Sequence, residues 1–132
     1  MTAANEQWIW LSMRMIHAAH DEQLVEHGGP DGLRDEGLLA SAMARPQHRA
    51  LYESPDAATL AASYAFAIAR NHPFVDGNKR TSLLALYTFL GLNGFDFIVP
   101  EAEAAAIILA LAAGEVSEES LTRWIRDNWP AK

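Results

Sequence analysis

Residues 72–80 read His72-Pro73-Phe74-Val75-Asp76-Gly77-Asn78-Lys79-Arg80, and an almost entirely apolar run, 81–92, follows directly. The nine residues hold a histidine, an aspartate, an asparagine, a lysine and an arginine around one glycine. The apolar run has no polar stripe, which is typical of a helix that passes through the middle of a domain. A polar loop therefore opens a predicted buried helix at about 78–92. Free backbone N–H groups and the helix dipole at such a start favour a bound anion.

The loop contains the parts that phosphoryl or nucleotidyl transfer to a protein hydroxyl requires. A base must take the hydroxyl proton as the new bond forms, and His72 is the only strong candidate in the loop. A divalent ion normally neutralises the polyphosphate, and Asp76 can bind Mg²⁺ directly or through water. Taken singly, both residues have simpler explanations, because a lone histidine is more often structural and Asp76 equally suits a helix cap.

Several further groups can hold a phosphate. The backbone N–H groups of Gly77, Asn78 and Lys79 predict an anion cradle. The Asn78 side chain adds a neutral donor, and Lys79 and Arg80 add positive charge. Arg70, in the last turn of the preceding predicted helix, is either a cation that suits the helix dipole or a further phosphate ligand. Desolvating so many polar groups without a ligand would cost several kcal/mol, which favours a binding site over a packing loop.

The nine-residue stretch closely resembles the signature of the Fic/Doc family, His-x-Phe-x-(Asp/Glu)-(Gly/Ala)-Asn-(Gly/Lys)-Arg. Lys79 stands where AMP-transferring Fic enzymes usually have glycine, and Leu83 stands where they have a second arginine. Both features resemble the Doc (death-on-curing) branch, the toxin half of bacterial toxin–antitoxin pairs. A second stretch, 32–46, is also similar to Doc sequences. The resemblance implies a compact all-α helical bundle around the buried helix at about 78–92, with at most a very short extended segment.

Carried onto this chain, the resemblance implies that His72 is the catalytic base and Asp76 the metal-associated acid, with Asn78, Lys79 and Arg80 as phosphate ligands. Doc toxins are implied to use ATP and Mg²⁺ and to transfer the γ-phosphate to a threonine of translation elongation factor Tu. Lys79 favours that direction, because its side chain takes space and adds charge where AMP transferrers have only backbone. Two alternatives stay open: transfer of AMP, and an inactive family member that only binds a partner.

The resemblance also bears on regulation. Fic-type proteins are often inhibited by a helix that reads (Ser/Thr)-x-x-x-Glu-(Gly/Asn), and residues 2–7 of this chain fail that pattern at the last position. We therefore expect inhibition by a separately encoded antitoxin, whose amphipathic segment would lie in a groove between apolar helices. Residues 36–44 are implied to border the active-site mouth as a flap that docks the target protein, although the sequence alone favours an ordinary surface helical hairpin.

Composition limits the classes of protein that fit. A chain of 132 residues predicts one domain, 1–132. The formal charge of −7 argues against direct nucleic-acid binding, which usually needs a basic face. The chain has no cysteine, no signal-peptide pattern and no apolar run of about 18 residues. We therefore expect a cytoplasmic protein without a membrane partner.

Periodicity and capping residues predict the remaining elements. The expected elements are, in order, a helix over about 6–27, a helix over 36–44 that stops at Pro46, an irregular segment over 47–53, a helix capped by Ser54 with Pro55 in its first position that runs to Asn71, an extended segment over 95–99, a helix that starts at Pro100, and a last helix capped by Ser117.

One further group of polar residues lies in the first predicted helix. His17, His20 and Asp21 are on adjacent turns, a spacing that can hold a metal ion. The His20-Asp21 pair also resembles the dyad of HD-domain phosphohydrolases. Because one turn of one helix supplies all the ligands, we favour the simpler interpretation of a half-exposed polar edge.

Overall fold

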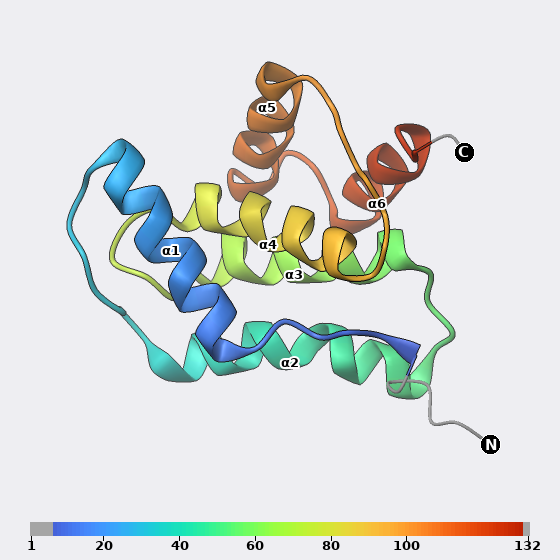
Figure 1. Ribbon diagram of the computed structural model, residues 1–132, viewed down its shortest axis with the longest axis horizontal. Coiled ribbons are helices and arrows are strands. Elements are labelled where there is room, and N and C mark those ends of the chain that lie inside the picture. The colour runs from blue at the N-terminus through green and yellow to red at the C-terminus, as the bar shows by residue number, and fades with distance from the viewer. Residues whose placement is uncertain (1–6, 131–132) are drawn as a thin grey trace.

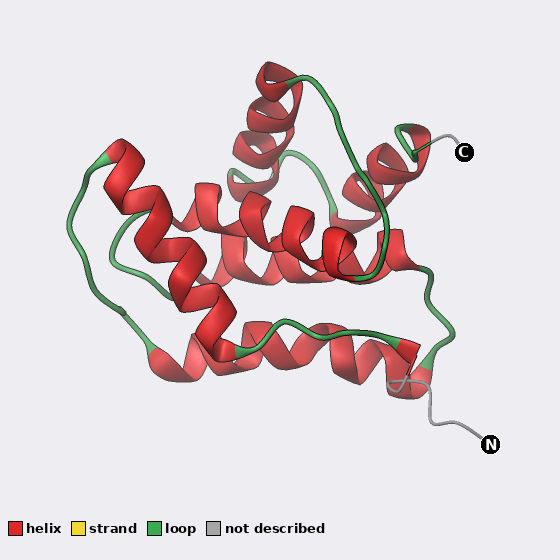
Figure 2. Cartoon of the chain, viewed as in Figure 1, coloured by secondary structure: helices red, strands yellow, loops and turns green. Residues whose placement is uncertain are grey.

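The computed structural model describes residues 7–130, in which the chain forms six helices. They are α1 (Met13–His27), α2 (Glu36–Tyr52), α3 (Ala57–Asn71), α4 (Asn78–Leu92), α5 (Glu101–Ala112) and α6 (Glu118–Asp127) (Figures 1 and 2). The described residues contain one isolated bridge, between Leu33 and Phe74, and 95–99 form no strand. This arrangement confirms the predicted all-α fold. Residues 1–6, which hold most of the 2–7 stretch, lie outside the described part.

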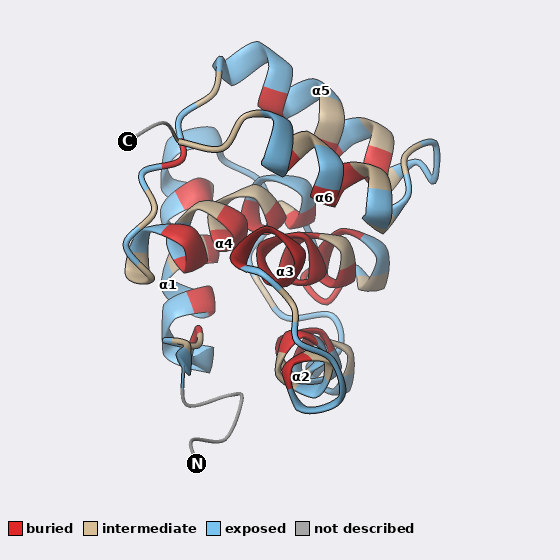
Figure 3. Ribbon diagram, turned by 90° about the vertical axis from the view of Figure 1, so that its right-hand side faces the viewer, coloured by how far each residue is buried: buried red, intermediate tan, exposed pale blue. Residues whose placement is uncertain are grey.

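Helix α3 lies at the centre of the bundle and contacts α2, α4, α5 and α6 (Figure 1). Twelve of its 15 residues are buried, and Figure 3 shows this helix buried almost all round. Most of the buried residues are alanines, which let the neighbouring helices approach closely. Helix α4 has the predicted bounds but exposes Thr88 and Gly91, so the expectation that it has no solvent face is wrong. The innermost helix is therefore α3, with α4 alongside it.

Residues 8–12 are not helical and α1 begins at Met13, so the predicted continuous helix over about 6–27 is wrong in its first part. Ser12 caps α1 and accepts a hydrogen bond from the N–H of Met15. The rings of Trp8 and Trp10 both contact Phe89, at centroid distances of 6.0 and 5.9 Å. Residues two apart share a side in extended chain but not in a helix. Packing of the two indoles on α4 thus favours the extended form.

Helix α2 continues through Pro46, so the predicted stop at Pro46 and the irregular segment 47–53 are wrong. A proline inside a helix removes one N–H donor and normally breaks or kinks it. Pro46 and Ala50 are nevertheless buried, and Arg49 donates to Glu118 at the start of α6. Tertiary contacts of the second half of α2 outweigh the local cost of the proline.

Helix α3 begins after Asp56, so the predicted cap at Ser54 and first position at Pro55 are wrong. The Asp56 carboxylate accepts hydrogen bonds from the Thr59 N–H at 2.9 Å and the Thr59 hydroxyl at 2.6 Å. It also pairs with Arg126 of α6 at 2.8 Å. Asp56, and not Ser54, is the N-cap of α3, because Asp56 also forms an ion pair with α6.

The two C-terminal helices start as predicted. Pro100 directly precedes α5, and the Ser117 hydroxyl accepts from the Ser120 N–H at 3.0 Å at the start of α6. None of the helices within residues 7–130 combines the length and the apolar character that a bilayer span requires.

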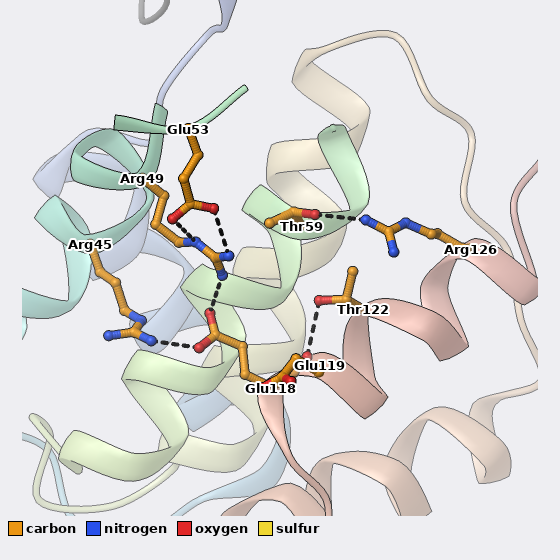
Figure 4. A pocket seen from close by; sticks show the side chains of 8 residues that line it. All are labelled: Arg45, Arg49, Glu53, Thr59, Glu118, Glu119, Thr122 and Arg126. Carbon is orange, nitrogen blue, oxygen red and sulfur yellow. Dashed lines mark hydrogen bonds and ion pairs between the residues drawn. The ribbon is translucent and has the colours of Figure 1, made fainter. Parts of the chain in front are cut away.

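A pocket of about 520 Å³ lies between α2, α3 and α6 and is lined by an ion-pair network (Figure 4). Glu118 accepts from Arg45 at 2.5 Å and from Arg49 at 3.0 Å, and Arg49 also pairs with Glu53 at 3.0 Å. Arg126, which lines the pocket as well, is held by the α3 cap described above. Every arginine of this pocket has a carboxylate partner, so the network ties the helices together and leaves no unpaired guanidinium for an anion.

Two substitutions at Asp56 separate its cap from its charge. Asp56→Asn keeps an oxygen for Thr59 but loses the charge that faces Arg126, whereas Asp56→Ala loses both. We expect Asp56→Ala to lower the free energy of unfolding by about 1 kcal/mol more than Asp56→Asn, the usual value of an N-cap. Urea unfolding at pH 7 measures both, with the exposed Asp127→Asn as the control. Equal effects of the two substitutions would contradict the capping role.

The charge at Asp56 also predicts a pH dependence. Burial disfavours the carboxylate, but the hydrogen bonds from Arg126 and Thr59 outweigh burial and lower the pKa of Asp56 to about 2. A lowered pKa stabilises the fold above the unfolded value of about 3.9, and this contribution is lost as the pH falls through about 2. The stability difference between wild type and Asp56→Asn should therefore stay constant above pH ~5 and shrink from pH ~4 downward. Because the side chain is half exposed, we expect a difference below about 1 kcal/mol.

Candidate active site

The loop 72–80 forms one wall of a pocket of about 460 Å³, and α5 forms another. The lining residues are His72, Val75, Asp76, Gly77, Asn78, Lys79 and Arg80 of the loop, Leu83 of α4, and Ala105, Ile108 and Leu109 of α5. The structure thus gathers the predicted loop residues in one cavity at the start of α4. The apolar wall from α5 was not predicted.

His72 ends α3 in the left-handed region, with φ 51° and ψ 56°. It is the only residue other than glycine with a positive φ in 7–130. Such backbone costs of order 1–3 kcal/mol and persists where neighbouring contacts impose it. Arg34 supplies such contacts, since its guanidinium donates to the backbone oxygens of His72 at 2.6 Å and of Asn71 at 2.8 Å. The exposed imidazole is therefore carried by a turn that Arg34 holds from outside.

Asn78 closes the loop with its buried amide. Its Oδ1 accepts from the Phe74 N–H at 3.0 Å, and its Nδ2 donates to the Phe74 carbonyl at 2.9 Å. The same Nδ2 lies 3.3 Å from Nδ1 of His72. Because the bonds to Phe74 fix the orientation of the amide, Nδ2 can only donate, so this contact is a hydrogen bond in the tautomer whose Nδ1 carries no proton. The side chain predicted to donate to a phosphate is thus occupied in holding the loop and the imidazole.

The first turn of α4 presents free backbone donors. Gly77 precedes the helix with φ 79°, a conformation that favours glycine. Among residues 7–130, the N–H groups of Gly77, Asn78, Lys79 and Arg80 have no hydrogen-bond acceptor. The side chains of Lys79 and Arg80 are exposed and form no ion pair with any described residue. Four free donors and two unpaired cations at a helix start suit a bound polyanion.

Asp76 is the residue of this pocket that suits a metal ion. Its carboxylate is exposed and has no hydrogen-bond or ion-pair partner among the described residues. One carboxylate oxygen lies close to Gly29, where an added Cβ would be only 2.5 Å away. A free carboxylate beside an anion cradle fits Mg²⁺, which binds a few protein oxygens together with phosphate oxygens.

His20 of α1 supports the loop from behind. Its ring is 2% exposed and stacks on Phe74 at 3.8 Å with an interplanar angle of 8°. Its Nε2 donates to the backbone oxygen of Asp76 at 2.8 Å. The interpretation of a half-exposed polar edge is therefore wrong for His20. Phe74, on which it stacks, is buried and anchors the loop to the core.

The metal group considered for α1 changes in composition. His17 contacts the edge of the Phe74 ring at 5.8 Å. His20 and Asp21 instead gather with Asp31, and one ligand atom from each lies within 4.8 Å of the others. Both aspartates are exposed, and Nε2 of His20 is already used by the loop. Exposed carboxylates often gather without an ion, and we assign no metal site to this group.

A family model described as "Fic/DOC family" matches residues 10–90. The chain belongs to the Fic/Doc family. It is 34% identical over 117 residues to "Protein kinase doc" of Escherichia phage P1, which covers 88% of this chain and 92% of that protein. It is 44% identical over 85 residues to "Toxin Doc" of Mycolicibacterium smegmatis, which covers 60% of this chain and 65% of that protein. Both relatives support the Doc branch, which Lys79 and Leu83 indicated.

One predicted ligand of this Fic/Doc site lies elsewhere. The Arg70 guanidinium carbon is 5.6 Å from the centroid of the Phe66 ring, and Arg45 lies 5.1 Å from the same ring. Arg70 does not line the pocket around His72. Arg70 was expected to be either a phosphate ligand or a cation that suits the dipole of the preceding helix. Its place in the last turn of α3, outside the pocket, supports the second interpretation.

Other residues of the Fic/Doc site were missed because they come from distant segments. Arg34, His20 and the α5 wall carry no local signal of a role at residues 72–80. Arg34 lies within the stretch 32–46, whose similarity to Doc sequences was the one available indication.

Substitutions at two neighbouring positions test the structural role of the Asn78 amide. Asn78→Ala would leave the buried N–H and carbonyl of Phe74 without partners, and each such group costs about 1–3 kcal/mol. We expect Asn78→Ala to lower the free energy of unfolding by about 2–4 kcal/mol, measured by urea unfolding. Lys79→Ala, one residue on, should change it by less than about 0.5 kcal/mol. A small effect of Asn78→Ala would show that the loop does not depend on this amide.

Proposed function

We propose that this protein is a Doc-type toxin that transfers a phosphate group from ATP to a hydroxyl of a protein target. The observation that supports this most is the pocket at the start of α4, in which a histidine, a free carboxylate and two unpaired cations surround free backbone N–H groups. The names of the two relatives, a protein kinase and a toxin, point the same way.

In this proposal each polar residue of the loop has its own role in binding the nucleotide. The polyphosphate lies against the N–H groups of residues 77–80, with Lys79 and Arg80 on its outer oxygens. Asp76 would supply a protein oxygen to Mg²⁺ bound with the nucleotide, and the ion would neutralise phosphate charge. The apolar wall of α5 suits the nucleobase, because side chains such as Ile108 and Leu109 offer it a flat apolar contact.

The chemical step follows from the position of His72. The target hydroxyl gives its proton to the imidazole as its oxygen bonds to the γ-phosphorus. The bond between that phosphorus and the β,γ-bridging oxygen breaks, and ADP leaves with the electron pair. Lys79 favours transfer of the γ-phosphate, because its added charge suits the terminal phosphates of a nucleotide held in this direction. Transfer of AMP is the alternative outcome of the same site.

The biological setting is part of the proposal. We propose a threonine of translation elongation factor Tu as the target, with arrest of translation in the cytoplasm as the result. We further propose that a separately encoded antitoxin neutralises the protein, as the "Toxin Doc" relative suggests. The net charge of −7 supports protein partners over nucleic acid.

ATP labelled separately at the α- and γ-phosphates tests the reaction. The protein is incubated with Mg²⁺ and purified elongation factor Tu, and the label on the factor is counted. We expect γ-label and no α-label. Label from the α-position would mean AMP transfer, and no label from either would reject elongation factor Tu as the substrate.

Replacing the proposed base tests the role of His72. His72→Ala should lower the transfer rate by about 10²–10⁴-fold, the usual contribution of a general base. His48→Ala, an exposed histidine of α2, is the matched control and should retain the wild-type rate. Retained transfer in His72→Ala would remove the histidine from the mechanism. Circular dichroism establishes that both variants are folded.

A further inference from the structure

A buried glutamine on α1 has no hydrogen-bond partner. Gln23 is 2% exposed, and neither its Oε1 nor its Nε2 is paired. Only four buried side-chain polar atoms lack a partner within residues 7–130, and this amide accounts for two of them. An unpaired buried amide costs free energy and calls for an explanation, and a second state in which the amide is paired supplies one.

The Gln23 amide lies directly against the phosphate-binding loop. A Cβ added to Gly77 would be 2.0 Å from Nε2 of Gln23 and 2.9 Å from its Oε1. Gln23 follows His20 by three residues, so the two side chains lie on the same face of α1. His20 holds the Asp76 carbonyl, and Gln23 covers the next residue. One face of α1 therefore forms the rear support of the turn that carries the free N–H groups.

We propose that Gln23 is a positioning residue for the phosphate-binding loop, whose amide forms hydrogen bonds with the loop backbone when a nucleotide occupies the site. The inference rests on the proposed function. The N–H of Asp76 has no acceptor among residues 7–130 and is not one of the N–H groups assigned to the phosphate, so the backbone next to Gly77 keeps a donor for this amide. Gln23 itself does not line the pocket, so it acts through the loop and not on the substrate.

Gln23 lowers the stability of the free protein but strengthens ATP binding in this proposal. Its replacement should therefore raise the unfolding temperature and weaken ATP binding. Gln23→Met keeps the length of the side chain and removes both polar atoms. We expect the free protein to unfold about 2–5 °C higher, because the unpaired amide is gone. We expect KM for ATP to rise about 5–20-fold with kcat within about threefold, because the loop is less well held for the phosphates while His72 is untouched. A packing role alone would not separate KM from kcat in this way.

Calorimetric titration with ATP and Mg²⁺, thermal unfolding and the labelled transfer reaction supply these readouts. The control is Gln47→Met, the same replacement on α2, which should leave ATP affinity unchanged. Equal ATP affinity in wild type and Gln23→Met would overturn the inference. A lower unfolding temperature for Gln23→Met would overturn it as well, because the amide would then be paired already in the free protein. Wild-type protein that binds no ATP would instead reject the proposed function.

A double-mutant cycle tests the contact without nucleotide. Gly77→Ala places a methyl group where the Gln23 amide lies, in addition to straining a backbone of φ 79°. Gln23→Ala vacates that space and leaves the strain unchanged. We expect the double variant to lose several °C less in unfolding temperature than the sum of the two single losses, since residues in contact are not additive. Additive losses would mean that the amide does not support Gly77.

Discussion

The site depends on one buried amide. Asn78 binds both the N–H and the carbonyl of Phe74, four residues earlier, so that the loop closes on itself before α4 begins. In a low-dielectric interior such bonds are strong, and leaving them unmade is expensive, so they hold the loop closed. The N–H groups of residues 77–80 precede the first complete turn of α4 and have no acceptor among the described residues. The free N–H groups are thus in place before any ligand binds.

Three residues from two separate segments hold the closed loop: Arg34 before α2, and His20 and Gln23 of α1. Arg34 binds the backbone oxygens on either side of the α3 end, His20 binds the Asp76 carbonyl, and Gln23 lies against Gly77. The strained φ of His72 is tolerated because these contacts share its cost. Donors and an imidazole that are already held in place need little rearrangement, which is what the proposed reaction would require of this site.

Local signals predicted the elements that local forces decide. The bounds of α4 and the starts at Pro100 and Ser117 follow from composition and capping within one turn. Pro46 was mispredicted because contacts of distant helices keep α2 intact around it. Local sequence also predicted part of the site, because the nine consecutive residues 72–80 indicated a binding pocket. Its rear support and the role of the Asn78 side chain come from tertiary contacts, which spacing along the chain does not encode.

Pairing of charges distinguishes the two main pockets. In the pocket between α2, α3 and α6 each arginine forms an ion pair with a carboxylate, and such pairs mainly fix the positions of these helices. At the start of α4, Lys79 and Arg80 have no acidic partner in the described chain although the protein carries a net charge of −7. Acidic side chains are abundant enough to pair with them, and free cations beside free N–H groups repel one another until an anion enters. A bound ligand therefore explains the unpaired charges of Lys79 and Arg80 better than the fold does. The charges of the pocket between α2, α3 and α6 are already paired and need no ligand.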